Sequence, residues 1–316
     1  MKQTVLITGG SGFAGSHLLE LLSQDKELAI HITTFGQLPE YLVGLLPSEN
    51  VHQVDLTQTQ ATAQLIASLK PTQIYHLASF TATGSSFAQA EKILANNTLL
   101  QLNLLEAVRL HAPTARVLSI CSADEYGLSL PEELPINEAH PFRPVNPYAV
   151  SKISQDMLAY VYATSYRLDI VRARPFNHIG ERQTEAFAIA TFAKQIAQIE
   201  AGQADKLKVG NLEAIRDFTD VKDMVKAYKL LMQRGQTGEV YNIGSGQGLS
   251  MKIILDNLIS FSKQKIEIIN DPEKMRPSDV KIMFADISKI MALGWRPEIT
   301  LDETLKRVLD YWREQI

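Results

Sequence analysis

Short apolar runs rich in β-branched residues alternate with longer stretches of helical periodicity through the first half of the chain. The runs predict strands, and the periodic stretches predict helices between them. Strands that alternate with helices are joined by right-handed crossovers into a parallel sheet covered on both faces. We therefore expect an α/β protein with a doubly wound parallel sheet. The predicted strands are residues 5–8, 30–34, 51–55, 74–77, 116–120 and 170–174, and the predicted helices are 16–22, 61–69, 88–110 and 148–166.

The regular alternation loosens after Pro175. Residues 220–243 have a helix pattern followed by a strand pattern, so we expect this strand to rejoin the sheet. Further helices are predicted at 186–201, 251–262 and 301–312, with a glycine-rich stretch at 244–248. The predicted domains are a dinucleotide-binding domain, 1–174 rejoined by about 215–243, and a smaller, discontinuous α/β substrate lobe, 175–214 and 244–316.

Composition restricts the possible function classes. The 316 residues include 31 Lys and Arg against 35 Asp and Glu, which gives a formal net charge of −4. This charge argues against a nucleic-acid protein that needs a broad basic face, but it leaves one local patch open. No apolar run approaches the roughly 18 residues of a membrane helix. One cysteine cannot form an internal disulfide, which favours a reducing compartment. We expect a cytoplasmic protein that binds neither nucleic acid nor membrane.

Three glycines, Gly9, Gly12 and Gly15, follow the first predicted strand and open the first predicted helix. Small residues at these positions let a pyrophosphate approach the helix N-terminus, where free N–H groups and the helix dipole favour an anion. The turn, with Phe13 and Ala14 between its glycines, therefore predicts a dinucleotide site.

The second predicted strand leaves the choice of dinucleotide open. NAD sites usually place an acid at the end of this strand, and NADP sites place an arginine nearby. Thr33 and Thr34 are neither, so NADPH and NADH both remain candidates. Asp55 and Leu56, at the end of the third predicted strand, are placed for the adenine end of the cofactor. Asp55 is also a candidate N-cap for the helix that follows.

Tyr148 and Lys152 are four residues apart in a predicted helix and therefore share one face. A cation so close is expected to lower the tyrosine pKa from roughly 10 towards the working pH, where a proton donor is most effective. Pro147 is a favourable first helical residue and places Tyr148 in the first turn. Ser122 follows the strand 116–120, at the carboxyl edge where α/β sheets bind ligands. Its hydroxyl can hydrogen-bond a carbonyl or alcohol beside the tyrosine.

Several motifs together resemble those of the extended short-chain dehydrogenase/reductases. They are TGGSGFAG in the glycine turn, HLAS at 76–79, Ser122 ahead of Tyr126-Gly127, the Tyr148/Lys152 pair, and LGWRPEITLDETL near the C-terminus. The resemblance implies a Rossmann fold and an NAD(P) cofactor, with Leu77 and Ala78 among its contacts. It also implies that Ser122, Tyr148 and Lys152 are the catalytic residues, the last two contacting the cofactor as well.

Three further segments are similar to the branch of that family that acts on GDP-6-deoxyhexoses: RPFNHIG (174–180), VGNLEAIRDFTDV (209–221) and RPSDV (276–280). This branch comprises GDP-mannose 4,6-dehydratases and GDP-4-keto-6-deoxy-D-mannose reductases. The similarity implies a GDP-sugar whose diphosphate is clamped by Arg216 and Arg276. It places Asn177 at the phosphate or sugar, and Asn211 and Leu212 at the base.

Ser122 and Asp124 bear on which reaction occurs. The dehydratases have threonine and glutamate at these two positions, and they need an acid/base pair to remove the C5 proton and expel the C6 hydroxyl. With serine and the shorter aspartate, we expect a reductase that converts the C4 keto group of GDP-4-keto-6-deoxy-D-mannose to give GDP-D-rhamnose, with Tyr148 as proton donor. A GDP-mannose 4,6-dehydratase, or another nucleotide-sugar epimerase or reductase, remains the alternative. A regulator without turnover is less expected, because it would have lost Tyr148 or Lys152.

The loop after HIG departs from the reductase pattern. It has Glu181-Arg182-Gln183 where the reductases have Pro-Gly-Gln, and we expect it to border the sugar. The resemblance also implies a homodimer formed by the helices at 88–110 and 148–166. Burial against the sheet is another explanation for the apolar residues of the first helix, which are Leu99, Leu102, Leu105 and Val108.

No metal site is predicted. His76 has no second histidine, cysteine or carboxylate at the spacing that metal ligands need, and a packed structural histidine is the simpler interpretation. Cys121 follows an apolar strand and is expected to be a buried small hydrophobe.

Overall fold

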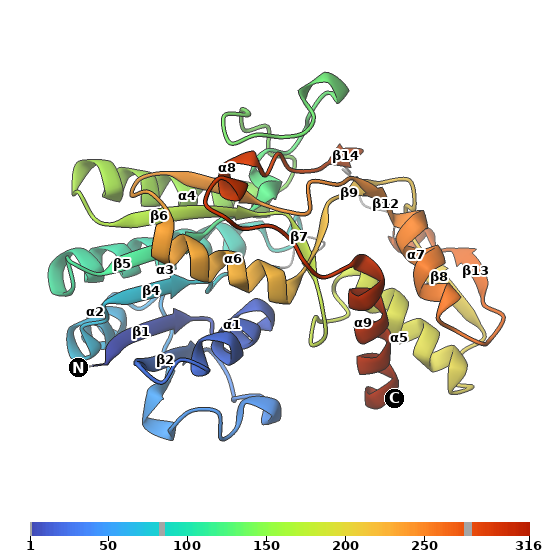
Figure 1. The fold of residues 1–316 in the computed structure, drawn as a ribbon, viewed down its shortest axis with the longest axis horizontal. Coiled ribbons are helices and arrows are strands. Elements are labelled where there is room, and N and C mark those ends of the chain that lie inside the picture. The colour runs from blue at the N-terminus through green and yellow to red at the C-terminus, as the bar shows by residue number, and fades with distance from the viewer. Residues whose placement is uncertain (1, 82–85, 275–279) are drawn as a thin grey trace.

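A seven-stranded, entirely parallel sheet forms the centre of the larger part of the molecule (Figure 1). The structure is a computed structural model and describes residues 2–81, 86–274 and 280–316. The strand order reverses at β1, which lies between β2 and β4. In spatial order the strands are β11 (Val240–Ile243), β6 (Ile170–Pro175), β5 (Arg116–Ile120), β4 (Gln73–His76), β1 (Gln3–Thr8), β2 (Leu28–Thr34) and β3 (Val51–Gln53).

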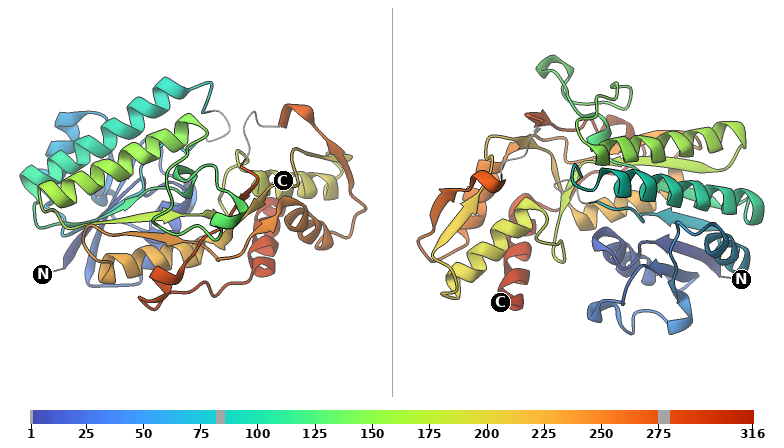
Figure 2. Two further views of the ribbon diagram at one scale, coloured as in Figure 1. Left: turned by 90° about the horizontal axis from the view of Figure 1, so that it is seen from above. Right: turned by 180° about the vertical axis from the view of Figure 1, so that it is seen from behind.

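Helices cover both faces of this sheet, which confirms the predicted doubly wound fold (Figure 2). On one face α1 (Phe13–Ser23) packs beside α6 (Val221–Arg234), and their apolar residues form one core cluster with the strands. On the other face lie α2 (Thr59–Leu69), α3 (Ala90–His111) and α4 (Pro147–Ser165), which form a second core cluster. The sheet is therefore buried on both sides, as its nearly continuous apolar strands require.

The third strand is shorter than predicted. It ends at Gln53, so the prediction that Asp55 terminates the strand is wrong. The Asp55 carboxylate accepts hydrogen bonds from the Thr57 backbone N–H (2.9 Å) and the Thr57 hydroxyl (2.7 Å), and this local turn takes the chain out of the sheet. Asp55 is also not the N-cap of α2, because that position belongs to Gln58.

A second lobe packs beside the carboxyl end of the sheet, on the right in Figure 1. Its core is a third apolar cluster formed mainly by three helices and β8, a strand that pairs in parallel with β13. These elements are α5 (Ala188–Glu200), α7 (Met251–Ser260), α9 (Leu301–Gln315), β8 (Lys206–Val209) and β13 (Glu267–Asn270). The remaining short elements are β7 (Asn177–Ile179) paired with β10 (Phe218–Asp220), β9 (Ile215–Arg216) between β12 (Leu249–Ser250) and β14 (Ile282–Met283), and α8 (Ser288–Met291).

The chain crosses between the two parts more than once. It leaves the large sheet after β6, builds α5 and β8, and returns through α6 to add β11 beside β6. The segment 220–243 therefore forms a helix and a strand, and the strand lies in the sheet. The domain boundaries given above remain a prediction. Among the described residues, no helix is long and apolar enough to cross a membrane.

Candidate functional site

The glycine turn between β1 and α1 is shaped by close backbone approaches. Gly9 has φ +68°, a conformation that glycine adopts without steric cost, and its carbonyl oxygen accepts the Gly12 N–H at 3.0 Å. A Cβ added to Gly15 would lie 2.2 Å from the Gly9 oxygen, so only glycine fits there. Gly12 is the N-cap of α1 and offers no side-chain cap. The first N–H groups of the helix are thus open to an anion.

Two threonines at the end of β2 support this turn. The Thr33 hydroxyl accepts the Gly9 N–H at 3.0 Å, and the Thr34 hydroxyl accepts from the Ser11 hydroxyl at 3.0 Å. The end of β2 therefore presents neutral hydroxyls engaged with the turn. This agrees with the expectation that neither an acid nor an arginine defines the cofactor there.

A cavity of about 960 Å³ runs from the glycine turn to the second lobe. Its volume lies at the upper end of the range typical of small-molecule sites. Leu212 is not among its lining residues and packs against the apolar cluster of the second lobe instead. Arg276 lies outside the described residues. The predicted site residues that line the cavity are Gly9, Gly12, Phe13, Ala14, Gly15, Asp55, Leu56, Leu77, Ala78, Ser122, Asp124, Tyr148, Lys152, Asn177, Asn211 and Arg216.

Ser122 is fixed where β5 ends. It is the N-cap of a single 3₁₀ turn, Ala123–Glu125, and its hydroxyl accepts the Asp124 N–H at 3.2 Å. In return, the Ser122 N–H donates to the Glu125 carboxylate at 2.9 Å, which completes a capping box. The serine is therefore held at the cavity wall by reciprocal bonds within the turn.

Tyr148 lies in the first turn of α4, as predicted. Asn146 is the N-cap and accepts the Ala149 N–H at 2.8 Å, and Pro147 is the first helical residue. Burial raises the pKa of Tyr148 above its usual range, the Asp124 carboxylate raises it further, and a hydrogen bond with Ser122 opposes both. The prediction that Lys152 lowers this pKa is wrong for the structure. A phenol with a raised pKa stays protonated.

The Lys152 ammonium is directed to other partners. Its Nζ donates to the Ile120 carbonyl oxygen at 2.8 Å and to the Gln155 amide oxygen at 2.9 Å. Burial lowers the pKa of Lys152. The spacing of four residues did place tyrosine and lysine on one helix face, but the lysine contacts the end of β5.

A buried ionic cluster lies behind Ser122. Asp156 accepts from Arg172, and it accepts from the Arg174 Nε at 2.7 Å. Burial and the Asp156 carboxylate raise the pKa of Glu125, whereas the two arginines lower the pKa of Asp156 against the effect of burial. The side-chain atoms of Cys121, Glu125 and Asp156 that could bind a metal ion lie within 4.8 Å of one another. Because the arginines already occupy Asp156, we interpret this group as an ion-pair network. Cys121 is buried, as expected.

Comparisons with known proteins agree with this geometry. The sequence profile of the GDP-mannose 4,6-dehydratase family matches residues 6–308. The chain is 35% identical to the GDP-6-deoxy-D-mannose reductase of Pseudomonas aeruginosa, over 100% of this chain and 99% of that protein. It is 28% identical to a GDP-mannose 4,6-dehydratase of Vibrio cholerae, over 96% of this chain and 92% of that one.

This chain belongs to the GDP-mannose 4,6-dehydratase family.

Solved structures give the same relationship. The structure of RMD from Pseudomonas aeruginosa complexed with NADPH superposes with a TM-score of 0.88 at 33% identity, with 100% of both chains covered. A Thermus thermophilus UDP-glucose 4-epimerase in complex with NAD has a TM-score of 0.87 at 26% identity, covering 99% of this chain and 100% of that one. The predicted membership of the extended short-chain dehydrogenase/reductases is confirmed.

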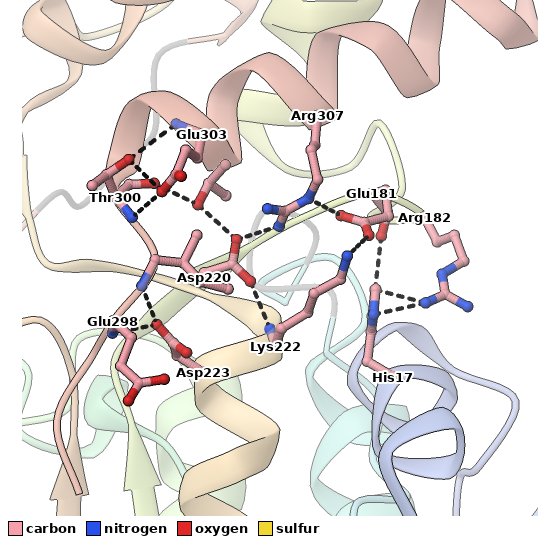
Figure 3. Close-up of polar contacts among 12 residues, drawn as sticks. His17, Glu181, Arg182, Asp220, Lys222, Asp223, Glu298, Thr300, Glu303 and Arg307 are labelled. Atoms are coloured by element: carbon pink, nitrogen blue, oxygen red, sulfur yellow. Dashed lines mark hydrogen bonds and ion pairs between the residues drawn. The ribbon is translucent and has the colours of Figure 1, made fainter. Parts of the chain in front are cut away.

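Only part of the Glu181-Arg182-Gln183 loop borders the cavity. Gln183 lines it, whereas Glu181 and Arg182 form ion pairs that join the two lobes (Figure 3). The Glu181 carboxylate contacts Lys222 of α6 at 2.7 Å and Arg307 of α9 at 3.2 Å. Burial opposes the ionised form, but the Lys222 hydrogen bond and the nearby cations hold the pKa of Glu181 at about 2.

Arg182 connects this loop to the helix of the glycine turn. It pairs with Glu20 of α1 at 2.7 Å, and its Nη2 donates to His17 Nδ1 at 2.7 Å. Because an arginine only donates, His17 accepts at Nδ1 and carries its proton on Nε2, which donates to the Glu181 carbonyl oxygen at 3.1 Å. Burial, and then the Arg182 charge, lower the pKa of His17 to about 4.

Sequence reasoning missed two asparagines of α3 that shape the cavity wall. The Asn97 amide accepts the Phe80 N–H at 2.8 Å and donates to the Ser151 hydroxyl at 2.9 Å, which ties the loop after β4 to α4. Asn103 donates to the carbonyl oxygens of Leu56 (3.0 Å) and Thr57 (2.8 Å). The available signal was the presence of amides among the apolar positions of a long helix, because buried amides need partners.

The low pKa of His17 predicts a pH dependence of stability. The unfolded chain binds a proton at His17 near pH 6.5, but the folded protein binds it only near pH 4. The free energy of unfolding therefore falls as the pH drops through this interval. For His17→Gln, we expect the fall between pH 7 and pH 5, measured by urea denaturation, to be smaller than in the wild type by about 2 kcal/mol. Above pH 7 the two profiles should run parallel, and identical profiles below pH 6 would contradict the assignment.

Proposed function

We propose that this protein reduces the C4 keto group of GDP-4-keto-6-deoxy-D-mannose to give GDP-D-rhamnose, with NADPH or NADH as the coenzyme. The observation that supports this most directly is the meeting of Ser122 and Tyr148 in the cavity that begins at the glycine turn. The similarity to a GDP-6-deoxy-D-mannose reductase over the whole chain gives the substrate class. The likeness to a reductase structure complexed with NADPH gives the coenzyme class.

The residues at the glycine turn fit a dinucleotide. The close backbone approaches at Gly9 and Gly15 shape a tight turn before the N-terminus of α1, which has no side-chain cap. Gly9, Gly12 and Gly15 would hold the pyrophosphate together with the backbone of Phe13 and Ala14. Asp55 and Leu56 would lie at the adenine end, and Leu77 and Ala78 between the two ends. When bound, a reduced nicotinamide supplies hydride.

Tyr148 and Ser122 handle the substrate oxygen in this proposal. The Tyr148 phenol is buried and protonated, so it donates its proton to the C4 oxygen as negative charge develops there. The Ser122 hydroxyl hydrogen-bonds the same oxygen and orients it. Lys152, whose Nζ is held by the Ile120 carbonyl and the Gln155 amide, would contact the coenzyme ribose. Hydride and proton together convert the carbonyl to an alcohol.

The second lobe supplies the groups for the nucleotide. Arg216 lines the cavity, and its Nη1 donates to the Ile215 carbonyl oxygen at 2.9 Å, which orients the guanidinium. A planar guanidinium binds a diphosphate in bidentate fashion. We propose that Arg216 acts there together with Arg276, with Asn177 at the phosphate or sugar. Asn211 borders the base. Because Leu212 packs into the lobe core, its side chain is not part of this proposal.

Asp124 is the observation that supports the second candidate, a GDP-mannose 4,6-dehydratase. Its carboxylate lines the cavity and lies close enough to Tyr148 to raise the pKa of that residue. A dehydratase needs such an acid to act at C5 and C6. An aspartate is one methylene shorter than glutamate, however, and Ser122 replaces the threonine of the dehydratases, so the reductase is favoured.

A regulator without turnover is disfavoured because Tyr148 and Lys152 are both present and line the cavity.

One assay separates these functions. The enzyme is incubated with GDP-mannose alone and, separately, with freshly made GDP-4-keto-6-deoxy-D-mannose plus NADPH or NADH. A reductase leaves GDP-mannose unchanged in the first mixture, and in the second it oxidises the reduced coenzyme and forms GDP-D-rhamnose. Loss of water from GDP-mannose would favour the dehydratase, and no turnover in either mixture would favour the regulator.

Tyr148→Phe tests the proton donor. The change removes one oxygen, so turnover of the keto sugar should fall by about 10²–10⁴-fold. Coenzyme affinity, measured by fluorescence titration, should remain within about twofold, because other residues carry most of the binding. Tyr311→Phe in α9 serves as a control that should keep full activity, since Tyr311 does not line the cavity. Unchanged turnover in Tyr148→Phe would contradict the assignment.

We further propose that the enzyme works in the cytoplasm as a homodimer joined through α3 and α4. A buried cysteine without a disulfide partner fits a reducing compartment. Leu105 and Val108 are buried against the sheet, so burial explains these two residues, and Leu102 is partly buried there. Leu99 is exposed and belongs to an apolar surface that a monomer would leave in water. The other exposed members of this surface are Leu110 of α3 and Val150, Met157, Tyr160 and Val161 of α4.

Val161→Glu tests the dimer. A carboxylate in the middle of this surface would be buried without a partner on association, which strongly disfavours the dimer. We expect light scattering after size exclusion to show a monomer for this variant and a dimer for the wild type. Ile253→Glu on α7, an exposed apolar position outside α3 and α4, should remain dimeric. A monomeric wild type would contradict the proposal.

A further inference from the structure

Tyr228 carries a buried hydroxyl that has no hydrogen-bond partner among the described residues. A small set of the described residues each have a buried side-chain nitrogen or oxygen atom with no hydrogen bond. Only Tyr228 in this set also lines the cavity. The set comprises His76, Arg116, Glu125, Arg172, Arg182, Thr219 and Tyr228.

Tyr228 lies near Tyr148, at the end of the cavity where the nicotinamide is proposed to bind. The residue is fully buried in α6, and its ring belongs to the core cluster on the face of the sheet that α1 and α6 cover. Its phenol is close enough to Tyr148 and Cys121 to interact electrostatically with both. Tyr148 comes from α4, on the opposite face. The two phenols therefore approach the same region, beyond the end of β5, from the two sides of the sheet.

An unpartnered hydroxyl in a protein core is unfavourable. It loses its hydrogen bonds to water on folding and gains none in return. Phenylalanine would fill the same space without that loss. A ligand that enters the cavity and pairs with the hydroxyl removes the cost, so the arrangement favours the liganded protein.

We propose that the Tyr228 hydroxyl hydrogen-bonds the carboxamide of the nicotinamide ring and is a further coenzyme-binding residue. This inference rests on the proposed function. The pyrophosphate belongs to the glycine turn, and the adenine belongs to the region of Asp55, which leaves the nicotinamide for the region around Tyr148. At that end the ribose hydroxyls are assigned to Lys152, and the carboxamide is the remaining neutral group that both donates and accepts hydrogen bonds. It is therefore the natural partner for a neutral phenol.

Tyr228→Phe tests the contact by removing only the oxygen. Dissociation constants are measured for NADPH and NADH, and for ADP-ribose and its 2′-phosphate, which lack the nicotinamide. We expect the variant to bind whole coenzyme about three- to tenfold more weakly and the fragments equally well. Without ligand, its melting temperature should be at least that of the wild type, because the unpaired hydroxyl is gone. The rise in melting temperature on adding coenzyme should be smaller than in the wild type.

Tyr241→Phe is the matched control. Tyr241 is also buried in the core cluster of α1 and α6, but its hydroxyl accepts the Gln236 N–H at 3.0 Å, and the residue does not line the cavity. This variant should lose stability without ligand and keep its coenzyme affinity.

Two outcomes would overturn this inference and leave the proposed function standing. One is equal affinity of wild type and Tyr228→Phe for whole coenzyme. The other is an equal loss for coenzyme and fragments, which would place the effect away from the nicotinamide. If the wild type itself binds neither NADPH nor NADH, the proposed function fails, and this inference fails with it.

Discussion

The pairing of β1 with β4 is the contact on which the site depends. The sheet order reverses at β1, so the chain leaving β1 and the chain leaving β4 diverge and open a crevice between them. Thr8 joins the two strand ends, because its hydroxyl bonds His76 Nδ1 at 2.7 Å and accepts the Ala78 N–H at 3.2 Å. Gly9 comes next and lies so near Ala78 that a Cβ would be 3.0 Å from that backbone. The glycine turn therefore packs against the chain that leaves β4, on the other side of the crevice.

Burial controls the chemistry of the groups that converge there. Tyr148, Tyr228 and Lys152 are each pushed towards their neutral forms, because the low-dielectric surroundings disfavour charge. His76, behind the site, has a pKa of about 3 owing to burial and the nearby Lys152 charge. A protonated phenol suits the reduction of a carbonyl, which takes up a proton at the nascent oxygen. Burial therefore keeps the Tyr148 phenol protonated in the free protein.

Local sequence patterns predicted the features that depend on neighbours in the chain. The glycine spacing, the helix start at Pro147 and the shared face of Tyr148 and Lys152 all follow from one or two turns of backbone. Contacts that depend on distant segments could not be predicted in this way. The spacing of four residues could not show that the Lys152 Nζ bonds the end of β5, thirty-two positions away in sequence. Nor could it show that Leu212 packs against the apolar cluster of the second lobe.

The Glu181-Arg182 loop illustrates the same limit and explains how the two lobes are held in register. It directly follows β7, which carries Asn177 and His178, so the strand that lines the cavity continues into residues that bind α1, α6 and α9 (Figure 3). His178 also stacks parallel to Phe13 of α1, with ring centroids 5.7 Å apart. These contacts fix the helix of the glycine turn against the strand at the proposed sugar site. Since hydride transfer requires coenzyme and sugar within a few tenths of an ångström of one geometry, a rigid junction between the lobes serves the reaction directly. Charged residues in a loop can therefore act on the chemistry without facing the substrate.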